Sequence, residues 1–365
     1  MKYRDPLKQI LSRTRSYWDQ PHTRPAVRRA FLRALQCRTP ELGAEVYLSE
    51  NQELVLYHTC KSRACPSCGY RAMMQWLRER WVALPENIYT GITFTMPDLL
   101  WPLFHDNPRL AKALPILAAK MIQTRVTARY GVRVGVIAIL HTFNGQMKFN
   151  SHVHTMITGG GLVGSGWMSR VYYDPFQIRR AWREAVIDLL RTALRAGRLR
   201  TSMSRDDIEF MLDEQERRIW RIKIQTFDDR GHFLQYAGRY VRRPQIAQGR
   251  ITGIGEQTVR FWYKDKKLCR RVEIECSLEE FLDRWMQHIP DHYQHAVRNF
   301  GLLAPRSLGL THAATFAILG QRRRPRPKPT HWANSIKRDF GYDPLLDHNG
   351  NRMKWAHRLK PKKAT

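Results

Sequence analysis

Two strand-like runs separated by a turn, the first of them strongly apolar, constrain the fold of this chain more than any other segment. Residues 132–143 read VRVGVIAILHTF, residues 149–162 read FNSHVHTMITGGGL, and Asn144-Gly145 lies between the two runs. Apolar and β-branched residues favour strands, and Asn-Gly is a strong signal for a hairpin turn. The two runs therefore predict an antiparallel hairpin.

The other segments mix strands with helices, which predicts an α+β protein with a central antiparallel sheet and flanking helices. Residues 88–96, IYTGITFTM, are β-branched and aromatic, and Pro97 ends them. The residue patterns indicate further strands at 219–226, 246–263 and 268–276. They indicate helices at 109–130, 175–197, 232–243 and 278–300.

Charge indicates the class of partner. The 365 residues include 62 Lys and Arg against 32 Asp and Glu, a net charge of +30, and 43% are apolar. That apolar content fills a core and excludes a disordered protein. The charge indicates a polyanionic partner, most simply nucleic acid. The sequence has neither eighteen consecutive apolar residues nor an apolar N-terminal signal, so we expect an intracellular protein without a membrane partner.

Three histidines lie near the turn of the predicted hairpin. Side chains alternate along a strand, so His152 and His154 point to the same face while Val153 points to the other. His141 ends the preceding strand, and the hairpin would bring it beside them. Three imidazoles can hold one divalent ion. The histidines alone leave the chemistry open between a hydroxide-generating zinc hydrolase and a Lewis acid that polarises a phosphate.

Two tyrosines supply a candidate nucleophile. Tyr236 and Tyr240 are four residues apart in the segment QYAGRYVRR, so a helix would place both hydroxyls on one face. Such a pair is more often a packing feature. Here Arg239, Arg242 and Arg243 lie close by, and cations or a metal are what a phenol of pKa near 10 needs to act as a nucleophile. We also expect Gly238 to thin the helix so that a backbone can approach.

Together these motifs resemble a known family. His152-Val153-His154, followed about eighty residues later by Tyr236-x-x-x-Tyr240, is similar to the two-tyrosine class of HUH endonucleases. The strand GITFTMP at 91–97 resembles their first strand motif. The blocks CKSRACPSCGYR, NSHVHTMITGGGL, YAGRYVRRPQIAQGRI and HAVRNFGLLAPRS resemble the bacterial rolling-circle transposases of that class, over roughly residues 30–320.

The resemblance implies a mechanism. HUH enzymes cut single-stranded DNA with a tyrosine, keep a 5′-phosphotyrosine link and leave a free 3′-OH. It implies Mg²⁺ or Mn²⁺ on His152, His154 and a third ligand, for which His141 is the candidate and Gln235 the alternative. Tyr236 and Tyr240 would be the two nucleophiles, acting on transposon ends and target.

The same resemblance organises the rest of the chain. Residues 1–84 would be an N-terminal helical and zinc-binding module that contacts DNA, residues 85–276 an HUH nuclease domain, and residues 277–365 a helical region with a basic tail. The sequence has no helicase P-loop of the GxxxxGK[ST] type, so host helicase or replication proteins are expected partners. A bacterial, cytoplasmic protein associated with the nucleoid is expected.

Two alternatives remain open at this stage. A plasmid rolling-circle replication initiator or relaxase would use the same chemistry for another purpose. A zinc-containing DNA-binding protein without catalytic activity would use none of it. Formation of a covalent tyrosine–DNA adduct discriminates against the second alternative, and joining of two cleaved ends discriminates against the first.

A cysteine cluster predicts a structural zinc site. Three of the six cysteines, Cys60, Cys65 and Cys68, fall within nine positions, and Cys-x-x-Cys-Gly is a common half-site for zinc. Related transposases commonly carry a further cysteine pair that is missing here, so His58 and Cys37 are both candidates for the fourth ligand. Free reduced thiols are the alternative.

Several cations are candidate DNA contacts, with a solvated charge run as the alternative for those after residue 321. The glycines at 159–161 would either let DNA backbone pass the strand end or turn the chain. The candidate contacts are Lys61, Arg63, Arg239, Arg242, Arg243, Arg322, Arg323 and Arg324.

Overall fold

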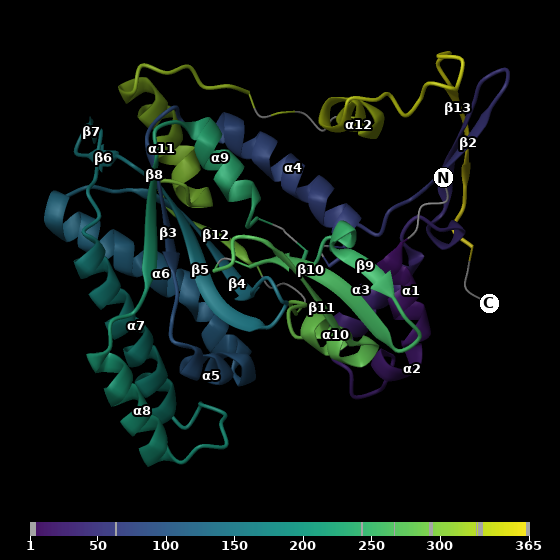
Figure 1. Ribbon diagram of the computed structural model, residues 1–365. Coiled ribbons are helices and arrows are strands. Elements are labelled where there is room, and N and C mark those ends of the chain that lie inside the picture. The colour runs from purple at the N-terminus through teal and green to yellow at the C-terminus, as the bar shows by residue number, and fades with distance from the viewer. Residues whose placement is uncertain are drawn as a thin grey trace. The chain divides into compact units, whose positions relative to one another are not determined.

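The chain forms two compact units, each assembled from segments that are distant in the sequence (Figure 1). The computed structural model describes residues 5–62, 64–241, 244–265, 267–291, 295–325, 327 and 331–362. Unit 1 comprises Met1–Ala72, Pro244–Asp291 and Arg326–Thr365, and unit 2 comprises Met73–Arg243 and His292–Pro325. In the part of the chain that the structure describes, no helix is long and apolar enough to cross a membrane.

Unit 2 is built on a five-stranded antiparallel sheet, which confirms the predicted α+β class. The predicted hairpin is its centre, and His141 pairs directly with His152 across it. The strand order is β12-β4-β5-β3-β8. The strands are β3 (Tyr89–Phe94), β4 (Gly135–Phe143), β5 (Phe149–Thr158), β8 (Ile222–Phe227) and β12 (Val297–Gly301).

Alternation along the strands gives this sheet two differently packed faces. Val153 and its in-phase neighbours pack against α6 (Pro108–Tyr130) and α7 (Pro175–Arg195), as expected for the residue between the two histidines. Residues of the opposite phase, among them Ile139 and Met156, pack against α9 (Arg230–Gly238) and the part of α4 (Pro66–Ala83) that belongs to unit 2. The histidines and tyrosines belong to this second face.

Smaller elements complete unit 2. Helix α8 packs on α7, and α5 packs on α6 and β5. Helix α11 follows β12 and contacts it. Their bounds are η2 (Asp98–Leu100), α5 (Trp101–Asp106), β6 (Gly161–Val163), β7 (Gly166–Met168), α8 (Arg205–Arg217) and α11 (Pro305–Ile318).

Unit 1 contains two three-stranded antiparallel sheets. In the first, Phe261 of the sheet packs against Phe281 of the helix that follows it, and Trp285 of the same helix packs against Phe31 of an N-terminal helix. This first sheet consists of β9 (Ile251–Ile254), β10 (Thr258–Lys264) and β11 (Arg271–Ser277), near α1 (Pro6–Arg13), α2 (Arg15–Trp18), α3 (Pro25–Gln36), η3 (Gln248–Arg250) and α10 (Leu278–Met286).

The second sheet of unit 1 joins the N-terminal region to the C-terminal end of the chain. Strand β1 (Ala44–Leu48) pairs with β2 (Glu53–Tyr57) on one side and with β13 (Lys354–Leu359) on the other. The basic C-terminal segment is therefore folded where the structure describes it. It also contains α12 (Trp332–Phe340), and η1 (Pro40–Leu42) precedes β1.

Two predicted helices are shorter than expected. The helix predicted at 278–300 ends at Met286, and residues 297–301 form β12, which pairs with β4 at an edge of the central sheet. The helix predicted at 232–243 ends at Gly238. Beyond it the amides of Arg239 and Tyr240 donate to carbonyls three residues back, the tighter pattern in which helices commonly finish.

Close packing of the chain accounts for the glycines at 159–161. A Cβ atom at Gly159 would lie 2.7 Å from the carbonyl oxygen of Ile88, and one at Gly160 would overlap the carbonyl of Met168. A Cβ atom at Gly161 would overlap the carbonyl oxygen of Arg133. The next residue, Leu162, pairs with Arg133 in an isolated antiparallel bridge. These glycines are required where three chain segments meet at the end of β5, so neither passage of DNA nor a simple turn is needed to explain them.

Candidate active site and zinc site

The central hairpin brings the three histidines together on one face of the sheet. His141 on β4 lies opposite His152 on β5, and His154 follows two residues later in the same phase. Each ring offers a nitrogen that lies within 4.8 Å of the corresponding nitrogen of the other two. His141 and His154 are buried, and His152 is half-buried. Three imidazoles at this spacing can reach a common divalent ion.

Hydrogen bonds to protein oxygens orient the three rings. Metal-binding histidines usually hold one ring nitrogen in this way, which fixes the tautomer and directs the other nitrogen to the metal. The donor set therefore fits a divalent ion. The bonds are His141 Nε2 with Tyr240 O at 2.8 Å, His152 Nδ1 with Asn150 O at 2.8 Å, and His154 Nδ1 with Thr93 Oγ1 at 3.1 Å.

Both tyrosines lie against this histidine cluster. Tyr236 is on the last turn of α9, and Tyr240 lies two residues beyond the end of the helix. The predicted helix is therefore too long, because Tyr240 lies outside it. The rings nevertheless meet, with centroids 4.9 Å apart. The Tyr240 ring stacks on the ring of His154 at 3.6 Å.

Tyr236 is the more enclosed of the two tyrosines. Its ring is buried, whereas Tyr240 is half-buried. Burial raises the pKa of the Tyr236 hydroxyl above its usual value, and a hydrogen bond with Thr93 opposes that shift. Thr93 Oγ1 lies 3.3 Å from the hydroxyl oxygen of Tyr236. Tyr236 is thus a neutral phenol at pH 7 unless another group assists its ionisation.

Strand β3 supplies two site residues that the sequence reasoning did not identify. Thr93 pairs with His154 in the sheet, and its hydroxyl reaches both His154 and Tyr236. Gly91, on the same face, makes room for Tyr236, because a Cβ atom there would lie 3.1 Å from Tyr236 Cε1. The signal available was their alternation in the strand 88–96, which puts both residues on one face.

The structure also bears on the roles expected for Gln235 and Gly238 of α9. The side chain of Gln235, the alternative third ligand, is exposed, whereas His141 is within ligand distance of the other histidines. Gly238 does not open the helix to DNA. A Cβ atom at Gly238 would lie 3.2 Å from Leu77 Cδ1, so this glycine permits close packing of α9 on α4.

The candidate DNA contacts are distributed over both units. Arg239 and Lys61 are exposed, in unit 2 and unit 1 respectively. Arg322, Arg323 and Arg324 are exposed at the end of unit 2 that follows α11. Arg63, Arg242 and Arg243 lie outside the described residues.

The cysteine cluster in unit 1 has four members. The sulfur atoms of Cys37, Cys60, Cys65 and Cys68 lie within 4.8 Å of one another. The Sγ–Sγ distances are 3.8 Å for Cys37–Cys68, 3.6 Å for Cys60–Cys68 and 3.9 Å for Cys37–Cys65. Tetrahedral zinc with bonds of about 2.3 Å separates its sulfur ligands by roughly 3.8 Å. The cluster therefore fits a structural Zn²⁺ ion.

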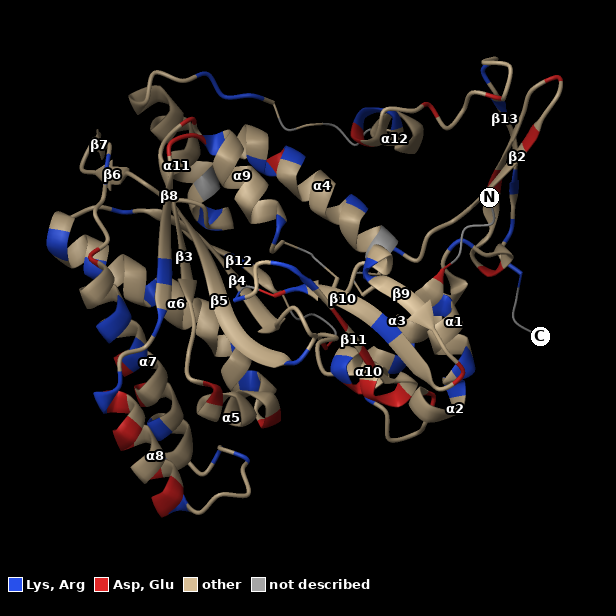
Figure 2. Cartoon of the chain, viewed as in Figure 1, with Lys and Arg blue, Asp and Glu red and all other residues tan. Residues whose placement is uncertain are grey.

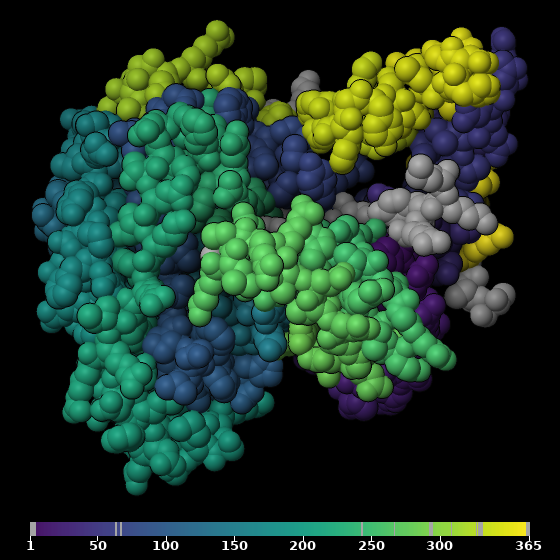
Figure 3. Space-filling view, viewed as in Figure 1, coloured from purple at the N-terminus to yellow at the C-terminus, as the bar shows by residue number. Residues whose placement is uncertain are grey.

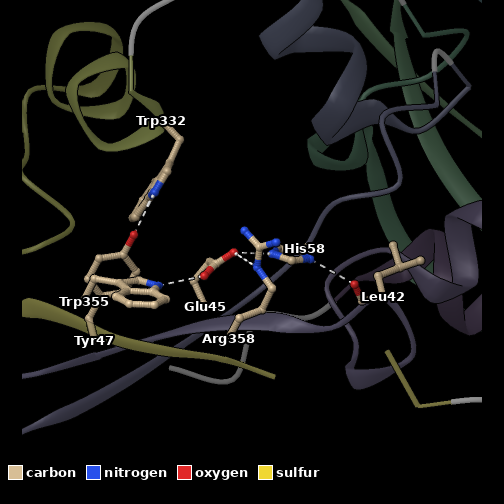
Figure 4. A network of polar contacts seen from close by, with 7 residues as sticks. All are labelled: Leu42, Glu45, Tyr47, His58, Trp332, Trp355 and Arg358. Carbon is tan, nitrogen blue, oxygen red and sulfur yellow. Dashed lines mark hydrogen bonds and ion pairs between the residues drawn. The ribbon is translucent and has the colours of Figure 1, made fainter. Parts of the chain in front are cut away.

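His58, the other candidate for the fourth zinc ligand, is engaged elsewhere (Figure 4). Its Nδ1 lies 3.0 Å from the carbonyl oxygen of Leu42, and its Nε2 lies 3.2 Å from Glu45 Oε1. Glu45 also accepts hydrogen bonds from Trp355 and Arg358 on β13. His58 therefore belongs to the network that holds the C-terminal strand, and Cys37 is the fourth member of the sulfur cluster that fits zinc.

Comparison with known proteins identifies both sites as parts of one kind of protein. Residues 135–308, which contain the three histidines and both tyrosines, match a family described as "Putative transposase". Residues 9–96, which contain the four clustered cysteines, match the "Transposase zinc-binding domain" of IS91-type elements. No solved structure matches the chain significantly.

Two similar proteins match over most of their length. The transposase of insertion sequence element IS801 from Pseudomonas savastanoi pv. phaseolicola is 31% identical over 326 residues, covering 85% of this chain and 78% of that protein. A "Putative transposase y4qJ" from Sinorhizobium fredii is 27% identical over 299 residues, covering 77% and 75%. With its zinc-binding domain and this coverage, the chain belongs to the IS91/IS801 family of insertion-sequence transposases.

Proposed function

We propose that this transposase cleaves and rejoins single-stranded DNA through 5′-phosphotyrosine intermediates formed on Tyr236 and Tyr240. The observation that carries the proposal is the shared position of two kinds of group. Tyr240 stacks on His154, a member of the histidine cluster, and Tyr236 is linked to the same histidine through Thr93. A nucleophile beside a candidate metal site is the arrangement that phosphoryl transfer requires.

The chemical step follows from these groups. The hydroxyl oxygen of one tyrosine loses its proton and attacks the scissile phosphorus, forming a P–O bond to the protein. The bond from phosphorus to the 3′ oxygen breaks, and that oxygen leaves as a 3′-OH after taking up a proton. Attack by another 3′-OH reverses the step and restores the tyrosine. Atoms and charge balance without any external energy source, because one phosphodiester replaces another.

The histidines and the nearby protein atoms prepare the site for that step. Mg²⁺ or Mn²⁺, when bound by His141, His152 and His154, would act as a Lewis acid on a non-bridging oxygen of the phosphate. The hydrogen bonds to Asn150, Thr93 and the Tyr240 carbonyl hold the rings in fixed orientations. The last of these bonds also ties the backbone of one tyrosine to a ligand, so the nucleophile and the metal site keep their spacing.

Two tyrosines allow two covalent links to exist at once. Each transposon end could then be held by its own tyrosine during strand transfer, without hydrolysis of either link. Single-stranded substrate would be supplied by host helicase or replication proteins. The family match favours this use over plasmid replication initiation, which would employ the same chemistry.

A covalent-adduct assay tests the proposal. The full-length protein is incubated with a labelled single-stranded oligonucleotide that carries the element's end, in Mn²⁺ or Mg²⁺, and adducts are resolved on denaturing gels. We expect adducts with the wild type and with each single variant Tyr236→Phe or Tyr240→Phe, and none with the double variant. Tyr172→Phe, at a tyrosine that is 63% exposed, is the control. Adduct formation by the double variant would reject the assignment.

A further inference from the structure

Unit 2 also contains a strongly basic segment outside the histidine cluster. The segment that follows α11 carries three consecutive arginines, Arg322, Arg323 and Arg324, which show as a run of blue (Figure 2). Side chains of this segment, yellow-green in the space-filling view, stand out from the surface (Figure 3). They line a cavity of about 590 Å³ together with Gln321, Glu86 and Arg230. We call this cavity the arginine groove.

Hydrogen bonds fix the start of the arginine run to the body of unit 2. The amide of Glu86 donates to Gln321 Oε1 at 2.8 Å, and Gln321 Nε2 donates to the Glu86 carbonyl at 2.6 Å. The backbone amide of Gln321 also donates to Phe316 O at the end of α11. These two hydrogen bonds between the Gln321 side chain and the Glu86 backbone fix the position of Gln321, the residue that directly precedes the three arginines.

The three arginines of the groove have no acidic partner among the described residues. Glu86 is the single acidic residue of the lining, and its carboxylate pairs with Arg230 at 2.8 Å. Arg230 is buried and also donates to the carbonyl of Leu84. Among the residues that the structure describes, no acidic group pairs with Arg322, Arg323 or Arg324. Three exposed guanidinium groups around a cavity suit a phosphate ligand, because each guanidinium can donate two hydrogen bonds to two oxygens of one phosphate.

The groove is connected to the tyrosines through one short helix. Arg230 is the first residue of α9, and Tyr236 follows six residues later, roughly 9 Å along the helix axis. Trp81, which is 41% exposed, lies beside the groove with the Arg230 guanidinium 4.3 Å from its ring. Aromatic rings beside cations are typical of surfaces that bind single-stranded nucleic acid.

We infer that the arginine groove binds the phosphodiester backbone of the single-stranded DNA whose cleavage is assigned to Tyr236 and Tyr240. The identity of this ligand rests on the proposed function. The groove itself rests on the Gln321 anchor and the arginines without acidic partners. The groove and both tyrosines belong to unit 2, so a DNA segment bound in the groove is held on the same unit as the nucleophiles.

Binding of an oligonucleotide, measured over a series of salt concentrations and without divalent ions, tests the groove. Arg322→Gln/Arg323→Gln/Arg324→Gln removes three charges from it. The control Arg195→Gln/Arg198→Gln/Arg200→Gln removes three exposed charges elsewhere in unit 2. Each phosphate contact on a single strand contributes about 0.7 to the slope of log affinity against log salt. We therefore expect the groove variant to lose about 2 from the slope, and the control to keep the wild-type slope.

Gln321→Ala separates a built groove from a basic tail. This variant keeps every charge and removes the anchor, so we expect weaker binding than the wild type at each salt concentration. Wild-type affinity in Gln321→Ala would overturn the anchored groove. Equal losses of affinity in the groove and control variants would show that binding depends only on the overall positive charge, and would also overturn it. An equal loss on duplex DNA of the same length would overturn the single-strand assignment.

Failure of this inference is distinguishable from failure of the proposed function. Binding is measured without the ions needed for cleavage, whereas the adduct assay reports on the tyrosines. Zinc content and thermal unfolding of each variant, compared with the wild type, establish that the fold is intact. A groove variant that binds weakly but still forms adducts at high protein concentration would support both statements.

Discussion

Thr93 Oγ1 lies 3.3 Å from the hydroxyl oxygen of Tyr236 and 3.1 Å from His154 Nδ1, so one hydroxyl joins the candidate nucleophile to a candidate metal ligand. A threonine hydroxyl has one proton to donate and lone pairs to accept. If His154 Nδ1–H donates to Thr93, the threonine proton remains for the phenolate of Tyr236. That order of bonds directs His154 Nε2 to the metal.

Thr93→Val should therefore weaken both parts of the site. Valine keeps the shape of the side chain but removes the hydroxyl, and losing such an outer hydrogen bond typically costs about 10–100-fold in metal affinity or activity. We expect Mn²⁺ affinity, measured by titration calorimetry, and the rate of adduct formation to fall within that range. Thr93→Ser, which keeps the hydroxyl, should retain most of both. Wild-type Mn²⁺ affinity and adduct rate in Thr93→Val would contradict the linkage.

Gly91→Ala should displace Tyr236 and destabilise the fold. The added Cβ atom would lie 3.1 Å from Tyr236 Cε1 and 3.2 Å from Phe227 Cε2, and overpacking of this kind typically costs about 1–3 kcal/mol. The free energy of unfolding in urea measures this cost. Gly249→Ala is the control, because an added Cβ atom there meets nothing within 4 Å beyond its own local backbone.

A double-mutant cycle identifies Tyr236 as the source of that cost. Gly91→Ala should destabilise the protein less when Tyr236 is already alanine, since the ring that crowds the new Cβ is gone. We also expect the adducts that remain in Gly91→Ala to shift from Tyr236 to Tyr240, as mapped by mass spectrometry of the DNA-linked peptides. Equal costs in both backgrounds would assign the strain to Phe227 instead.

The hairpin was predictable because its signals are local. Apolar strand residues flank an Asn-Gly turn, and alternation alone places His152 and His154 on one face. Thr93 could not be found in the same way. Its role depends on pairing with His154, a residue 61 positions later, and on the way α9 lies over the sheet.

Other features could not be predicted from the sequence, because they depend on contacts with segments that are distant along the chain. Residues 297–301 follow a helical pattern and were expected to extend it, but pairing with β4 makes them a strand. The choice between Cys37 and His58 as zinc ligand was likewise open, since both precede Cys60 at plausible spacing. The structure favours Cys37, because Leu42 and Glu45 contact both ring nitrogens of His58 while Cys37 lies within the sulfur cluster.

Adduct formation through Tyr236 should depend on pH in a defined direction. Burial, the largest influence, raises the pKa of Tyr236 above the usual value, so the phenol is neutral at pH 7 and only a small fraction is ionised. Because the phenolate is the attacking form, the rate should rise about tenfold per pH unit between pH 7 and 9 without reaching a plateau. Single-turnover rates of the Tyr240→Phe variant measure this. A plateau below pH 8 would show a lowered pKa.

Replacing Cys37 should remove zinc, whereas replacing His58 should not. Cys37 lies 3.8 Å from Cys68 and 3.9 Å from Cys65, sulfur to sulfur, so Cys37→Ser leaves three sulfur ligands where structural zinc takes four. We expect elemental analysis to give about one zinc per chain for the wild type and for His58→Ala, and well below one for Cys37→Ser. The melting temperature of Cys37→Ser should fall, because zinc binding contributes to the stability of such modules.

The exposed Cys269 provides the matched control for that change. Cys269→Ser replaces the same atom outside the cluster and should keep both zinc and melting temperature at wild-type values. His58→Ala tests the neighbouring network separately, because it breaks the contacts with Leu42 and Glu45 without touching a sulfur. Loss of zinc from His58→Ala as complete as from Cys37→Ser would put the imidazole back among the ligands and require the loop before Cys60 to rearrange when zinc binds.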